Sequence, residues 1–125
     1  MLTWILAAVG IYVFCLFLPA TMMVLETGVF YALGPRDDEP APPVMRARAM
    51  RAQRNMLETL PVFLAFAILA MLDGAPAQQA LTGAALYVFG RLAYIPACLA
   101  GVPGLLTLAW GVSLAGLAAM ALALG

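Results

Sequence analysis

The polar residues best placed to do chemistry lie between positions 45 and 63, in the stretch MRARAMRAQRNMLETLPVF. Arg51, Asn55 and Glu58 stand at positions i, i+4 and i+7, so on a helix their guanidinium, amide and carboxylate groups share one face. Arg48 continues that face one turn earlier. Such a group is either a polar network that fixes helix packing or a binding site for a polar ligand, and the spacing alone does not choose between them.

The apolar sequence around these groups predicts an all-α integral membrane protein. Hydrophobic residues make up 66% of the 125 positions, charged residues 10%, and the mean hydropathy is +1.03. A chain this short cannot hide so much apolar surface in a water-soluble core. The net charge of zero gives no indication of a nucleic-acid partner. We expect the lipid bilayer to be the main environment of the chain.

The elements that must position the polar groups are four transmembrane helices in a single domain, 1–125. Gly34-Pro35, the polar turn Asp73-Gly74-Ala75-Pro76 and Gly101-Val102-Pro103-Gly104 separate the apolar runs. The predicted helices are 2–33, 44–72, 77–98 and 103–124. The first run lacks an amino-terminal Arg or Lys and is longer than the apolar region of a signal peptide, so we interpret it as a membrane span.

Orientation follows from the arginines, because five of the six lie between the first helix and the apolar part of the second, which begins at Met56. The positive-inside rule places loop 34–44 in the cytoplasm and both termini on the opposite side. Arg36, Arg46 and Arg48 are interpreted as topology determinants that contact lipid headgroups. Small residues at Gly111, Ala115 and Ala119 suit close packing within the bundle or between subunits.

With this topology, a count of helical turns places Glu26, Glu58, Arg91 and Tyr94 at one level near the cytoplasmic face. Ionisable groups at such depth usually pair inside the bundle, so we expect Arg91 to pair with Glu58 or with Glu26. No histidine occurs, and the two cysteines, Cys15 and Cys98, are isolated in apolar runs. His-dependent triads are excluded, and no metal site is predicted.

Two motifs together resemble the family of membrane-associated proteins in eicosanoid and glutathione metabolism (MAPEG), which includes microsomal glutathione transferases and leukotriene C4 synthase. One motif is Arg51-Ala52-Gln53 with Asn55 and Glu58, followed by Pro61 and Phe63. The other is Tyr87-Val88-Phe89-Gly90-Arg91 with Tyr94. The chain is most similar to a bacterial-type member, which implies a bacterial inner membrane.

The resemblance implies a homotrimer of four-helix bundles that holds glutathione between subunits near the cytoplasmic face. By position in the motifs, the residues that would contact glutathione are Arg51, Gln53, Asn55, Glu58, Arg91 and Tyr94. Glutathione carries two carboxylates and an ammonium, which guanidinium, carboxylate and amide groups can recognise. The implied activity is glutathione transfer, or a peroxidase-like reaction, on hydrophobic small molecules from the bilayer.

The chain departs from the family pattern at two positions. Cys98 stands where members of this pattern have a second tyrosine, and Leu105-Leu106 stands where they have an arginine that stabilises the glutathione thiolate. No catalytic residue is assigned. The alternative function is therefore a non-catalytic scaffold or accessory subunit that binds other membrane proteins. A small multidrug exporter is disfavoured, because arginines surround Glu58 and Glu26 is far from the middle of its helix.

Overall fold

The computed structural model describes residues 1–74 and 76–125, and these residues form helices without any strand. The elements are α1 (Leu2–Thr27), α2 (Val29–Leu33), α3 (Val44–Leu72), α4 (Gln78–Ala100) and α5 (Pro103–Leu124). All but α2 are long and apolar enough to cross a bilayer. The chain is therefore an all-α, multi-pass membrane protein, as the sequence predicted. Ala75 of the predicted turn at 73–76 lies outside the described residues.

The first predicted helix is divided at Gly28. This residue has φ 88° and ψ 161°, a conformation that side-chain-bearing residues rarely adopt. Its N–H still donates to Val24 O at 2.9 Å, which completes the last turn of α1, and the short α2 then begins at Val29. The other three long helices begin and end within two residues of the predicted positions.

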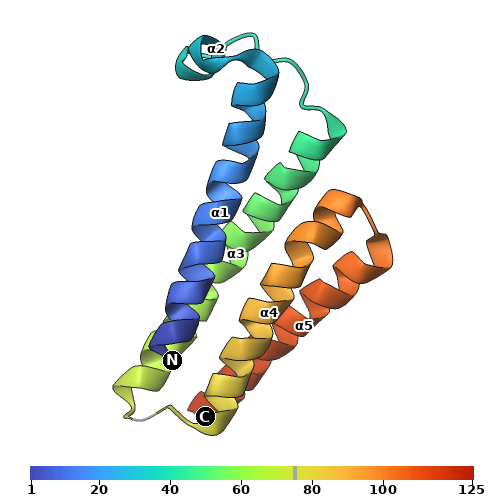
Figure 1. Cartoon of the computed structure of the whole chain (residues 1–125). Helices are drawn as coiled ribbons and strands as arrows, with labels where there is room; N and C mark the ends of the chain where they lie inside the picture. Colours follow the sequence, from blue (N-terminus) through green and yellow to red (C-terminus); the bar gives the residue numbers. More distant parts are fainter. Residues whose placement is uncertain (75) are drawn as a thin grey trace.

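The long helices are arranged as two pairs, α1 with α3 and α4 with α5 (Figure 1). The termini lie together at one end of the bundle, and the 34–43 loop lies at the other. Between the pairs, the rings of Phe63 and Tyr87 stack with their centroids 4.4 Å apart. The Tyr87 hydroxyl hydrogen-bonds to Thr59 Oγ1 at 3.1 Å, so this buried phenol has a polar partner.

Glycines let α4 and α5 approach closely. A Cβ atom added to Gly83 would stand 2.6 Å from Gly116 O, and one added to Gly116 would stand 2.6 Å from Tyr87 N. The predicted series of small residues lies on another side of α5, since Ala115 is exposed and Gly111 has open space around it. The face of α5 that packs on α4 instead includes Ser113 and Gly116. The predicted role of the series between subunits is still a prediction.

Arg48 of α3 caps the carboxyl end of α4. Its Nη1 donates to Leu99 O at 3.0 Å, and Cys98 Sγ donates back to Arg48 O at 3.3 Å. A cation is favourable here, because the last carbonyl groups of a helix carry partial negative charge. Gly101, at φ 72°, ends α4 beside this guanidinium. Arg48 therefore fixes α3 against α4 at the loop end of the bundle.

Candidate functional site

The predicted site is centred on Arg91, whose side chain is buried between α3 and α4. Arg91 is 2% exposed, and its Nη1 donates a hydrogen bond to Asn55 Oδ1. The guanidinium carbon lies 5.4 Å from the ring centroid of Tyr87 and 5.7 Å from that of Tyr94. Two aromatic faces and one amide therefore surround a full positive charge within the membrane-spanning part of the chain.

The predicted pairing of Arg91 with Glu58 or Glu26 is wrong within the chain. Glu58 is exposed, and the ion pairs among the described residues do not include one between Glu58 and Arg91. Glu26 lies near the end of α1, where its Oε2 is 2.9 Å from Arg46 Nε. Among the described residues, Arg91 Nε and Nη2 are buried without a hydrogen-bond partner. Buried donors without a partner are rare in native proteins, so these two nitrogens need an explanation.

A cleft opens beside this buried group, where α3, α4 and α5 meet. Its volume is about 330 Å³, and its walls are Asn55, Tyr94, Leu106, Thr107 and Trp110. The amide, the phenol and the Thr107 hydroxyl supply polar atoms, while the leucine and the indole supply an apolar wall. The cleft can therefore hold a polar group on one side and an apolar group on the other.

The six predicted site residues fall into three groups. Asn55 and Tyr94 line the cleft, and Arg91 contacts both of them. Arg51 and Glu58 stand one turn before and after Asn55 on α3, both exposed, and both lie within Coulombic range of Tyr94. Gln53 points elsewhere, because it lines a cavity between α1 and α3. Successive residues of an α-helix are rotated by about 100° around the helix axis, so Gln53 lies on a different side of α3 from Arg51 and Asn55.

Sequence reasoning missed Thr107 and Trp110 as residues of the cleft. Both lie in the first two turns of α5, at positions that an apolar helix pattern does not distinguish from lipid-facing ones. Tyr94 lies near the carboxyl end of α4, and a short connection leads from there to the start of α5. A count of helical turns from this connection places Thr107 and Trp110 at the depth of Tyr94, and this signal could have indicated both residues. Within residues 1–74 and 76–125, no three Cys, Asp or Glu side chains gather in a way that could hold a metal ion.

Four helices able to span a membrane, with a cleft near one end of the bundle, define a small multi-pass membrane protein. The sequence model of the MAPEG family matches residues 1–125, the whole chain. The chain therefore belongs to the MAPEG family. No curated protein and no solved structure gives a significant match to it.

Proposed function

We propose that the chain binds glutathione at the cleft beside Arg91 and conjugates it through its sulfur to hydrophobic electrophiles that arrive through the bilayer, at the cytoplasmic membrane face. The observation that carries this proposal is the pair of buried Arg91 nitrogens without a hydrogen-bond partner among the described residues. A carboxylate is the acceptor that a guanidinium binds best, and glutathione has two. Asn55 and Tyr94 hold Arg91 from the side of the cleft.

The exposed charges beside the cleft suit the remaining groups of glutathione. Arg51 can pair with the second carboxylate, and Glu58 can pair with the ammonium. Both side chains are exposed on one face of α3, and Trp110 at the cleft is 42% exposed. We propose that a neighbouring copy in a homotrimer covers this face, so that glutathione is held between subunits. In the reaction, the thiol loses its proton to water, and the sulfur forms a bond to the electrophilic carbon as the leaving group departs.

The wall of the cleft formed by Leu106 supports a second candidate function, a glutathione-binding scaffold or accessory subunit without transferase activity. Leu106 lines the cleft at the position where the family pattern has an arginine. No Arg, Lys or His follows Arg91 in the sequence, so α5 offers no cation to a thiolate. The donors of the residues that line the cleft are all neutral: the Asn55 amide, the Tyr94 hydroxyl and the Trp110 indole, while the Thr107 hydroxyl donates to Pro103 O. A neutral donor stabilises a thiolate less than a cation does.

The first test is calorimetric titration of the detergent-purified protein with glutathione. We expect saturable binding, weakened about tenfold by Arg51→Ala and by Glu58→Ala, because each removes one charge-assisted contact. Arg36→Ala is the matched control, since it removes an exposed cation outside the cleft and leaves binding unchanged. Absence of binding at millimolar glutathione would overturn the proposal.

A second assay separates the two candidate functions. Conjugation of glutathione to 1-chloro-2,4-dinitrobenzene is measured for the native chain and for Leu106→Arg. Activity of the native chain identifies a transferase. If the native chain binds glutathione without activity and Leu106→Arg is active, the native chain is a scaffold that lacks only the cation. If both proteins bind glutathione and neither is active, the chain is a scaffold whose cleft differs from that of a transferase in more than this cation.

A further inference from the structure

A second buried arginine lies outside the cleft, at the loop end of α1 and α3. Arg46 is 1% exposed, and its Nη1 donates to Glu39 Oε1 at 2.7 Å. Its Nε lies 2.9 Å from Glu26 Oε2, although the N–H is not aligned for a hydrogen bond. Nη2 makes no hydrogen bond to a described residue. Arg46 thus links the 34–43 loop to α1 and retains N–H donors that no described residue accepts from.

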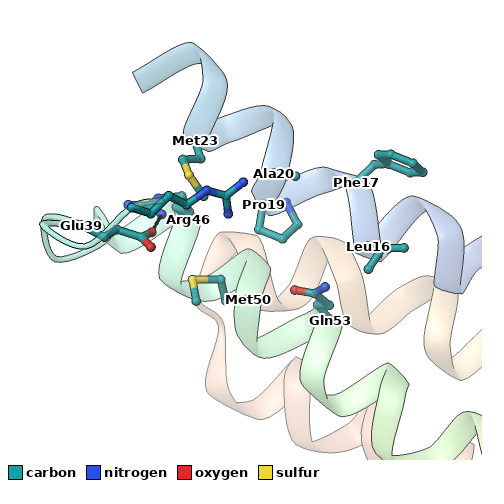
Figure 2. Close-up of a pocket in the computed structure, with 10 residues that line it drawn as sticks. Leu16, Phe17, Pro19, Ala20, Met23, Glu39, Arg46, Met50 and Gln53 are labelled. Atoms are coloured by element: carbon teal, nitrogen blue, oxygen red, sulfur yellow. Dashed lines mark hydrogen bonds and ion pairs between the residues drawn. The ribbon is translucent and has the colours of Figure 1, made fainter. Parts of the chain in front are cut away.

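Arg46 lies at the polar end of a cavity of about 390 Å³ between α1, α3 and the loop. Arg36 and Glu39 line the same end, and the wall along α1 is apolar from Met23 back to Leu16. Figure 2 shows the polar residues Glu39 and Arg46 at one end of the cavity and Leu16 and Phe17 at the other. Phe17 is 61% exposed, so the apolar end of the cavity is open at the surface of α1.

The apolar wall of the cavity is longer than one headgroup layer of a membrane is thick. Phe17 and Met23 are separated by six residues of α1, or roughly 9 Å along the helix. Each headgroup layer is about 5–8 Å thick, so a molecule in this cavity would have its polar part in that layer and its apolar part in the hydrocarbon. This holds whichever end of the bundle faces the cytoplasm.

We propose that this cavity binds a zwitterionic phospholipid with a primary amine, of the phosphatidylethanolamine class. Its phosphate lies between Arg36 and Nη2 of Arg46, its ammonium donates to the free oxygen of Glu39, and one acyl chain follows Phe17. Arg36, Arg46 and Glu39 line the cavity, and Glu26 pairs with Arg46 next to it, so the charges of this cluster sum to zero, which matches a headgroup without net charge. An ammonium that can donate hydrogen bonds fits Glu39 better than a quaternary amine does.

The test is native mass spectrometry of the full chain in detergent, after incubation with an equimolar mixture of phosphatidylethanolamine, phosphatidylcholine and phosphatidylglycerol with identical acyl chains. We expect phosphatidylethanolamine to be retained about tenfold over phosphatidylcholine, since one charge-assisted hydrogen bond separates them. Glu39→Gln should abolish this preference, and Arg36→Gln should lower the retention of every phospholipid. Asp37→Asn, an exposed change in the same loop, is the control and should change neither.

These variants avoid Arg46, whose replacement would leave Glu26 without its partner and could unfold the loop end. Equal retention of the three lipids, or a preference that survives Glu39→Gln, would overturn the proposal. Preferential retention of phosphatidylglycerol would also overturn it, in favour of an anionic headgroup. Soluble glycerophosphoethanolamine should compete only weakly, and full competition by it would refute the role of the acyl chain and of the apolar wall.

Discussion

The hydrogen bond between Arg91 and Asn55 should be measurable as a coupling in a double-mutant cycle of unfolding free energy, without glutathione. Asn55→Ala removes the only acceptor that Arg91 has among the described residues. Hydrogen bonds to charged groups contribute about 1.5–3 kcal/mol, whereas neutral pairs between membrane helices average about 0.6. Because Arg91 is 2% exposed, water cannot replace the amide, and we expect a loss of about 2 kcal/mol.

The other arm of the cycle, Arg91→Met, removes the buried charge together with its two unpartnered nitrogens. We expect its stability to lie within about 1 kcal/mol of the native protein, since an apolar replacement of a poorly paired buried charge is often neutral. In the Arg91→Met background, Asn55→Ala should cost less than about 0.5 kcal/mol, giving a coupling near 2 kcal/mol.

The assay is reversible unfolding in mixed micelles at increasing SDS, followed by tryptophan fluorescence. Gln53→Ala is the matched control, because it removes an amide from the same helix on the side away from Arg91. The reasoning would be refuted if Asn55→Ala costs no more than Gln53→Ala. A loss above about 3 kcal/mol for Arg91→Met would instead show that Arg91 pairs with an anion from outside the chain, as breaking a buried ion pair does.

Two glycine predictions test the packing. Gly116→Ala places a methyl group 2.6 Å from Tyr87 N and should cost about 1–3 kcal/mol through separation of α4 and α5, while Gly111→Ala, in open space, should cost nothing. Gly101→Ala puts a side chain at φ 72° against the Arg48 guanidinium and should cost at least about 1–2 kcal/mol, while Gly104→Ala should not. The stability of all four variants is measured from the SDS concentration at the midpoint of unfolding. An equal loss of stability in the two variants of either pair would contradict the packing described.

The arrangement of the predicted site residues could be anticipated only in part. Arg51, Asn55 and Glu58 share a helical face, and the count of turns placed Arg91 at the level of Glu58, one turn from the Asn55 that Arg91 contacts. The choice of partner could not be predicted, because a guanidinium can reach either an amide or a carboxylate at that depth. Only the rotation of α3 against α4 brings Asn55 to Arg91 and leaves Glu58 exposed.

The sequence by itself determined the class, the spans and the family of this protein. Apolar runs of sufficient length must become helices in a bilayer, because every backbone N–H and C=O in hydrocarbon needs an internal partner. Glycine and proline then set most of the helix boundaries. The break at Gly28 is an exception, because a glycine can adopt its backbone conformation but can equally continue a helix. Helix formation and helix boundaries depend on neighbouring residues in the sequence, so the sequence alone is enough to predict most of them.

Only the tertiary structure decided which arginines are buried and what they contact. Arg46 and Arg48 occur in one short polar run, yet one is paired with two carboxylates and the other caps α4. The cleft likewise joins Asn55 to Thr107 and Trp110, half a chain away. Such contacts depend on the rotation and depth of each helix relative to its neighbours, which packing at glycines such as Gly83 and Gly116 sets.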